Sequence, residues 1–178
     1  MKKILVQFDG SNFYNKVKTL LPGTHLTTFN YLELTKFLTK VSSNSINYYV
    51  GEIRRQEKSN KSKTLYSSQQ SLFSKLRLQK IVIKLGYLLF SSGKFHEKGV
   101  DVQIAVDMVK GAIKNEFDIC YLISSDTDLL PAIKIAKEEN KKIVYVGFEK
   151  SISKALMKNC SSSIILKKKD LLPFTKVK

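Results

Sequence analysis

Four aspartates stand out in a chain that is otherwise strongly basic. They are Asp9, Asp101, Asp126 and Asp128. Carboxylates that converge on one point repel one another and take up protons unless a cation lies between them. Mg²⁺ and Mn²⁺ prefer oxygen ligands of this kind and keep several bound waters. If the fold brings these acids together, the sequence predicts a site for Mg²⁺ or Mn²⁺.

Three of the four acids stand at the ends of expected strands. Asp9 closes the apolar run of residues 3–9, and Asp126 and Asp128 directly follow the apolar run of residues 117–125. In an open parallel sheet, binding sites form outside the carboxyl ends of the strands, and these ends share one edge. We therefore expect Asp9, Asp126 and Asp128 to converge there. An N-cap with an acidic first turn is the structural alternative for the last two, but it leaves Asp9 unexplained.

Asp101 is placed by the angular spacing of an α-helix at residues 100–114. At about 100° per residue, the apolar side chains fill one broad arc, and Asp101 falls in its middle as the one charged residue facing inward. A buried carboxylate is unfavourable unless it is compensated, so a site is one interpretation. Stabilisation of the helix N-terminus is the other. Asp107 falls on the polar side, where a solvated acid is expected.

Expected strands and helices alternate along the chain. Strands are expected at residues 3–9, 45–54, 81–90, 117–125, 141–148 and 162–168, and helices at residues 12–21, 29–41, 65–80, 100–114, 128–140 and 151–158. Loops are expected at residues 54–63 and 91–99. This alternation predicts an α/β fold with a mainly parallel sheet and helices on both faces. The length predicts one domain over residues 1–178, with a basic loop at about residues 54–64.

The charge balance predicts a polyanionic partner. Lys and Arg number 31 against 15 acids, which gives a net charge of +16. Nucleic acid is the first candidate and an anionic membrane the second, while a codon bias toward lysine is the structural alternative. No apolar run is long enough to span a bilayer, so no membrane partner is expected. Two unpaired cysteines and the lack of an export signal favour the cytoplasm.

Three motifs resemble the signatures of NYN domains, which are PIN-like ribonucleases of the LabA type. They are DGSNFY at residues 9–14, KGVDV at 98–102 with AVD at 105–107, and LISSDTDLLP at 122–131. Each motif alone is weak, but the three occur in order and span nearly the whole chain. Two positions depart from the family pattern: Ser125 stands where glycine is more frequent, and Leu129 where phenylalanine is common.

The resemblance implies a fold, an activity and a set of site residues. The fold is a PIN-like three-layer α/β/α sandwich with a mainly parallel central sheet, and the activity is that of a metal-dependent ribonuclease. Asp9, Asp101, Asp126 and Asp128 would form the acidic cluster that holds Mg²⁺ or Mn²⁺. Asn12 would orient the first carboxylate or a water, and Ser124 or Ser125 would bind a phosphate or a metal-bound water. Asp107 also recurs in the family pattern.

Basic and aromatic residues are expected to flank the acidic edge. The basic candidates are Arg54, Arg55, Lys58, Lys61 and Lys63 in the expected loop, and Lys94 and Lys98 before the acidic helix. Four tyrosines could stack on single-stranded bases, although at least half of them are expected to pack in the strands instead: Tyr48, Tyr49, Tyr66 and Tyr87.

The sequence thus supports three functional hypotheses. The first is a Mg²⁺- or Mn²⁺-dependent endoribonuclease that acts on single-stranded RNA. The second is a PIN-like module that binds RNA or a protein partner without cutting. The third is a regulatory or toxin-like protein whose partner controls access to the site. A homodimer is compatible with all three, although no exposed apolar stripe that would require one is expected.

Overall fold

The strands form one twisted sheet in the computed structural model, which describes residues 2–42, 45–53, 60–91 and 94–175. The strands of these ranges are β1 (Ile4–Asp9), β2 (Ser45–Glu52), β3 (Val82–Ser91), β4 (Lys94–Lys98), β5 (Ile119–Ile123), β6 (Lys142–Phe148) and β7 (Ser162–Leu166). Their order in the sheet is β4-β3-β2-β1-β5-β6-β7. Every neighbouring pair is parallel except the edge pair of β3 and β4.

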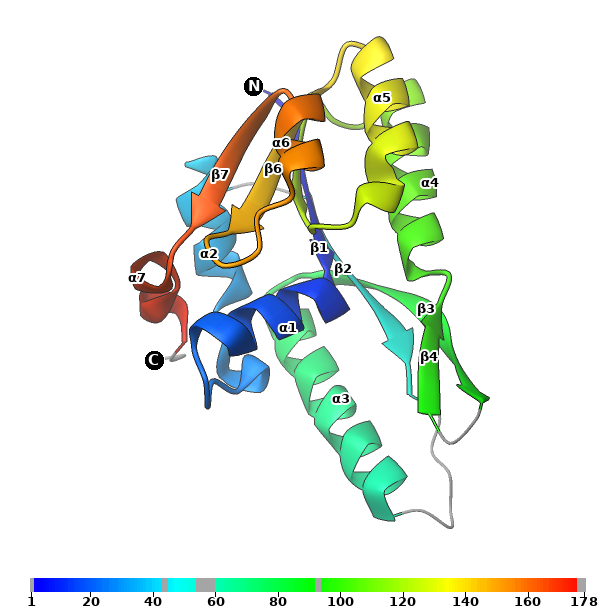
Figure 1. Cartoon of the computed structure of the whole chain (residues 1–178), viewed down its shortest axis with the longest axis vertical. Helices are drawn as coiled ribbons and strands as arrows, with labels where there is room; N and C mark the ends of the chain where they lie inside the picture. The colour runs from blue at the N-terminus through cyan, green and yellow to red at the C-terminus, as the bar shows by residue number, and fades with distance from the viewer. Residues whose placement is uncertain (1, 43–44, 54–59, 92–93, 176–178) are drawn as a thin grey trace.

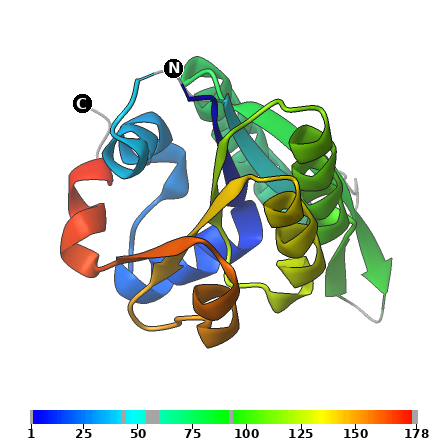
Figure 2. The same ribbon diagram turned by 90° about the horizontal axis from the view of Figure 1, so that it is seen from above.

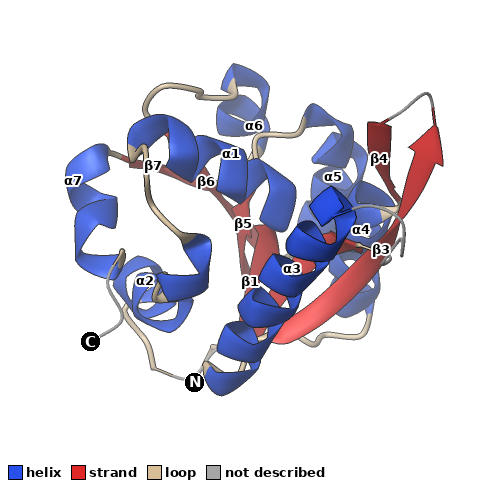
Figure 3. Cartoon of the chain, turned by 90° about the horizontal axis from the view of Figure 1, so that it is seen from below, coloured by secondary structure: helices blue, strands red, loops and turns tan. Residues whose placement is uncertain are grey.

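Helices cover both faces of this sheet (Figures 1 and 3). One face packs against α1 (Gly10–Leu20), α2 (Tyr31–Thr39), α3 (Asn60–Leu78) and α7 (Lys168–Leu171). The other face packs against α4 (Val100–Ile113), α5 (Leu130–Glu138) and α6 (Lys154–Asn159). Short 3₁₀ turns are η1 (Leu26–Thr28), η2 (Thr127–Leu129) and η3 (Leu172–Phe174). Figure 2 shows α2 and α7 on one side and α4 and α5 on the other, so the three-layer sandwich is confirmed.

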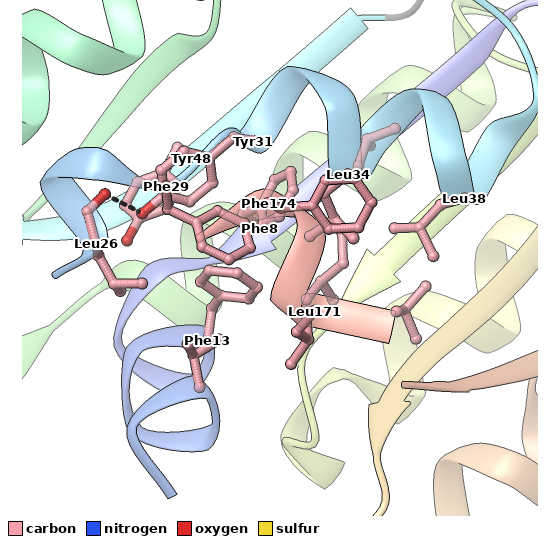
Figure 4. Packing of buried hydrophobic residues seen from close by; sticks show 14 of the residues in the cluster. Phe8, Phe13, Leu26, Phe29, Tyr31, Leu34, Leu38, Tyr48, Leu171 and Phe174 are labelled. Atoms are coloured by element: carbon pink, nitrogen blue, oxygen red, sulfur yellow. Dashed lines mark hydrogen bonds between the residues drawn. The ribbon is translucent and has the colours of Figure 1, made fainter. Parts of the chain in front are cut away.

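The central strand explains why the sequence folds around it. All six residues of β1 are buried, as expected for a parallel strand covered on both faces. Phe8 faces the α1–α2 side, where its ring meets the rings of Phe13 and Tyr31 at centroid distances of 5.4 and 5.6 Å. Figure 4 shows Leu171 and Phe174 of the C-terminal segment in the same cluster. The C-terminal segment is therefore part of the core.

Three expectations about local structure were wrong. Residues 94–98 form strand β4 and not a loop, because a β-hairpin edge needs no apolar run to pair with β3. Residues 60–63, expected in the basic loop, already belong to α3, and residues 54–59 lie outside the described ranges. Lys167 and Lys168, expected at the end of the last strand, instead cap and begin α7, because β7 ends at Leu166.

Candidate active site

The candidate site lies where the strand order reverses. Successive strands run outward from β1 through β2 and β3 on one side, and from β5 through β6 and β7 on the other. Parallel α/β sheets form binding sites at such switch points, outside the carboxyl ends of the strands. In Figure 1, α1, α4 and α5 all begin on this side of the sheet. Asp9 ends β1, and Ser124 follows the end of β5 beside it.

A single buried hydroxyl joins the two strand ends. Ser124 is fully buried, and its Oγ donates to Asp9 Oδ2 at 2.7 Å. The same Oγ accepts from the backbone N–H of Asp126 at 3.1 Å. Asp9 and Asp126, 117 positions apart in the chain, thus share one hydrogen-bonding partner. The structure therefore brings the Asp9 carboxylate and the Asp126 backbone to one hydroxyl.

The start of α1 fixes the other side of Asp9. Asp9 is the N-cap of α1, and its Oδ1 accepts from the backbone N–H of Asn12 at 3.0 Å. Gly10 lets the start of α1 lie close to β2, because a Cβ at this position would lie 2.6 Å from the Tyr49 carbonyl oxygen. The Asn12 backbone N–H thus helps to orient the carboxylate. The Asn12 side-chain oxygen is buried and has no hydrogen-bond partner within the described part of the chain.

Asp126 and Asp128 also serve the helix that follows them. Asp126 caps η2, and its Oδ1 accepts from the backbone N–H of Asp128 at 2.9 Å. Asp128 is exposed in the first turn, where a negative charge is favourable. The structural alternative considered for this pair is therefore present. This capping does not compete with a metal site. Asp126 uses only Oδ1 as the cap, so its second carboxylate oxygen can still bind an ion, as can both carboxylate oxygens of Asp128.

Asp101 is exposed, which corrects the expectation that it faces the apolar interior. It lies in the first turn of α4, where the chain turns out of β4 through Gly99 with a φ of 79°. The direction of a side chain from the helix axis decides burial only where another element stands opposite. At its first turn α4 meets the open edge of the sheet, so Asp101 is placed at that edge.

The buried side of α4 also differs from the expected one. Val102, Val106 and Ile113 are exposed, although all three belong to the expected apolar arc. Asp107, expected as a solvated acid, has a side chain only 17% exposed. The correction has one cause: α4 is rotated so that part of its polar side faces the sheet.

A polar network beneath α4 explains this rotation. The Tyr49 hydroxyl donates to Asp107 Oδ2 at 3.0 Å and accepts from the Gln7 amide at 2.8 Å. Gln7 also donates to the carbonyl oxygen of Ile104 on α4 at 3.3 Å. Burial raises the pKa of Tyr49, so its phenol stays protonated and donates. The lone polar residue in the apolar run of β1, two positions before Asp9, was the sequence signal for this network.

Three comparisons place the chain among known proteins. The NYN domain pattern matches residues 3–167. The chain belongs to the NYN domain family. A 57-residue stretch is 40% identical to the uncharacterized protein MJ0482 of Methanocaldococcus jannaschii, and the match spans 32% of this chain and 24% of that protein. The crystal structure of a protein of unknown function from Vibrio parahaemolyticus, VPA0982, shares the fold at a TM-score of 0.69 and 19% identity. That match covers 96% of this chain and 95% of the other.

NYN domains are generally nuclease-like. Within the described ranges of this NYN domain, no three His, Cys, Asp or Glu side chains lie close enough together to hold one metal ion. The four aspartates therefore do not form a compact cluster. The described helices also include none with the length and apolar character of a membrane span.

The two serines of the third motif have separate surroundings. Ser124 is fully buried and already bonded on both sides, so a direct contact with phosphate does not fit its position. The Ser125 hydroxyl lies 3.3 Å from the Tyr145 hydroxyl and 3.4 Å from the Ser151 carbonyl oxygen. The side chain at this departure from the family pattern is thus bonded toward β6 and the α6 loop, not to Asp9.

The expected nucleic-acid contacts are only partly within the described residues. Lys63 on α3 and Lys98 at the end of β4 are exposed. Lys61 lies on α3 and Lys94 begins β4, whereas Arg54, Arg55 and Lys58 lie outside the described residues. Tyr48 and Tyr49 are buried in the core, as expected for at least half of the four tyrosines.

Proposed function

We propose that this NYN domain is a metal-dependent ribonuclease that hydrolyses phosphodiester bonds in single-stranded RNA. The observation that carries the proposal is the convergence of Asp9 and Asp126 through Ser124 at the switch point of the sheet. Asp101 and Asp128 are exposed at the start of the flanking helices. The net charge of +16 supports attraction to a polyanion.

The residues at this edge fit Mg²⁺ or Mn²⁺. Mg²⁺ is usually held by one or two carboxylates and keeps several waters, so it does not need a compact cluster of three acids. Asp9 and Asp126 would hold the ion, with Asp101 and Asp128 able to reach its waters. The buried Asn12 oxygen without a partner offers an acceptor for such a water. When bound, the ion would polarise the phosphate and supply a water of lowered pKa.

Protein groups orient the Asp9 carboxylate and would attract the RNA phosphates. Ser124 and the Asn12 backbone N–H fix both oxygens of the Asp9 carboxylate. The exposed Lys63 and Lys98, with the basic side chains of residues 54–61 and 94, would attract the phosphates beside this edge. The Asp9 carboxylate is thus fixed before RNA arrives. We expect the basic groups to flank it.

The test uses labelled single-stranded RNA with Mn²⁺, then with EDTA, then with Asp126→Asn. We expect Mn²⁺-dependent cleavage that EDTA and Asp126→Asn abolish, with RNA binding equal or tighter in the variant because it removes negative charge. Asp118→Asn is the matched control, because Asp118 stands before the other end of β5, where its carboxylate accepts from the Lys3 N–H at 2.7 Å. Cleavage that persists in EDTA or in Asp126→Asn would refute the metal mechanism.

A non-catalytic RNA-binding or regulatory module is the second candidate. The spread of the four acids in the described part of the chain favours it. Salt-dependent RNA binding without any cleavage would decide for this alternative. The cytoplasm remains the proposed location.

A homodimer also remains a prediction. The exposed Val102, Val106 and Ile113 on α4 form an apolar stripe that was not expected from the sequence, next to a groove shared with Pro131 and Ile135 of α5. Sedimentation velocity of the wild-type chain and of Val106→Glu measures whether two copies associate through this face.

A further inference from the structure

A second hollow lies on the α1 side of the sheet. It has a volume of about 670 Å³ and is formed by α1, the turn at residues 23–27, α3 and Ile53. Ile53 directly follows the end of β2, so the hollow opens at the same edge of the sheet as Asp9. Tyr49 of β2 stands opposite Asp9, and Ile53 is four residues further along. At about 3.3 Å per residue, Ile53 lies about 13 Å beyond the level of Asp9 along the strand direction, while Tyr14 brings the lining of the hollow back to the helix that starts at Asp9.

The lining of this hollow suits a nucleobase. Its apolar part consists of Leu26, Ile53, Leu65 and Leu72, and its polar part of Thr24, Thr27, His25 and Ser68. None of the described side chains that line it carries a carboxylate, so nothing there repels a phosphate next to the base. A mainly apolar hollow with a few polar groups is the usual setting for a flat heteroaromatic ligand.

Tyr14 supplies a stacking surface at this hollow. The Tyr14 side chain is 42% exposed, although other side chains of α1 are packed in the core. Lys18 Nζ lies 4.7 Å from the centroid of the Tyr14 ring. The lysine places a positive charge over one face of the ring, and the Tyr14 side chain remains 42% exposed. Single-stranded nucleic acids are held by this combination of an aromatic face and a nearby cation.

The hollow is formed before any ligand binds. Gln69 of α3 is buried and makes two backbone bonds to the end of β2. Its Oε1 accepts from the Ile53 N–H at 2.8 Å, and its Nε2 donates to the Gly51 carbonyl oxygen at 2.8 Å. These bonds fix α3 against β2, so a base entering the hollow does not have to order its walls.

We propose that this hollow is a subsite for one nucleobase of single-stranded RNA, stacked on Tyr14 with its phosphate near Lys18. The assignment rests on the proposed function, because it takes RNA as the ligand of the neighbouring site. It adds a contact that is independent of sequence, since every base has an aromatic face. The subsite would hold a nucleotide near the one whose phosphate lies at Asp9.

The experiment measures binding in EDTA, so that no cleavage is required. Fluorescein-labelled RNA of twelve nucleotides is titrated against the wild type, Tyr14→Ala, Tyr14→Leu and Tyr14→Phe, and then replaced by an abasic strand of equal length. We expect binding of the base-containing strand to weaken about 5- to 100-fold in Tyr14→Ala and Tyr14→Leu. Tyr14→Phe should bind as the wild type does, and the abasic strand should not distinguish the variants.

The matched control is Phe37→Ala. Phe37 on α2 is 40% exposed, and Lys40 Nζ lies 4.3 Å from its ring centroid, so it reproduces the aromatic and cation pair away from the hollow. Its removal should leave RNA binding unchanged. The subsite is refuted if Tyr14→Ala and Tyr14→Leu bind like the wild type, if Phe37→Ala weakens binding equally, or if the abasic strand shows the same loss.

Two further outcomes separate this inference from the function on which it rests. If the protein never cuts RNA but binds it through the Tyr14 ring, the subsite is supported and the nuclease proposal is refuted. If Tyr14→Ala cuts RNA and binds it with the wild-type affinity, only the subsite is refuted. A mononucleotide that binds as tightly as the twelve-nucleotide strand, and through Tyr14, would overturn the RNA assignment in favour of a free nucleotide.

Discussion

Replacement of Ser124 by alanine tests whether one hydroxyl holds the candidate site together. The change removes the 2.7 Å bond to the Asp9 carboxylate and leaves the Asp126 N–H without its acceptor. A hydrogen bond to a charged group contributes about 1.5–3 kcal/mol, and an unpaired part-buried N–H costs about 1 kcal/mol more. We therefore expect the free energy of unfolding to fall by about 2–4 kcal/mol in the absence of metal.

This loss is measurable by urea unfolding monitored by circular dichroism. With a slope of about 2 kcal/mol per molar urea, the midpoint should fall by about 1–2 M while the slope stays constant. Residues that orient a metal ligand typically change metal affinity or activity by 10–100-fold. The Mn²⁺ concentration needed for half-maximal cleavage should therefore rise by about that factor.

Thr35→Val is the matched control for the loss of a buried hydroxyl. Thr35 is fully buried like Ser124, but its Oγ1 has no hydrogen-bond partner among the described atoms. Its replacement by a methyl group should leave the unfolding free energy unchanged or raise it slightly. If Ser124→Ala is as stable as Thr35→Val and needs no more Mn²⁺, Ser124 does not position Asp9 and the reasoning fails.

Three further predictions concern groups near the site and in the core. Tyr49→Phe removes the donor to Asp107 and the acceptor for Gln7, so urea unfolding should show a loss of about 2–4 kcal/mol. Ser125→Gly should leave Mn²⁺-dependent cleavage of labelled RNA unchanged, because the hydroxyl is bonded toward Tyr145; lost activity would contradict this. Burial raises the pKa of Cys160 to about 11, despite Lys137, so its contribution to stability is full below pH 9 and declines as pH approaches 11. Iodoacetamide at pH 8 should accordingly alkylate unfolded chains far faster than native ones, as mass spectrometry can follow.

The sequence was sufficient for the sheet and for placing Asp9 and Asp126 at the ends of neighbouring strands. Both follow from one rule, because parallel strands end at a common edge and acids placed directly after them must lie there. Strand β4 was not predictable in this way, since KFHEK lacks an apolar run and is a strand only because β3 lies beside it. The start of α3 at Asn60 was hidden for a similar reason, because its first turn has no apolar periodicity.

The orientation of α4 shows what a helical pattern leaves open. The apolar residues of this helix span so broad an arc that hydrophobicity alone permits several rotations about its axis. The rotation that the structure adopts exposes Val106 and buries the Asp107 contact with Tyr49. Directional hydrogen bonds hold α4 in the rotation that the structure adopts.

That selection has a consequence for the candidate site. Apolar contacts tolerate sliding and rotation of a helix. The Tyr49 hydroxyl, in contrast, can satisfy Gln7, Asn47 and Asp107 together in only one geometry. Gln7 lies two residues before Asp9 on the same face of β1, and it also bonds the carbonyl oxygen of Ile104 on α4. The same strand thus fixes both the first carboxylate and the helix that carries Asp101. This network therefore fixes the position of Asp9 relative to the start of α4, which carries Asp101, although the two acids form no compact cluster.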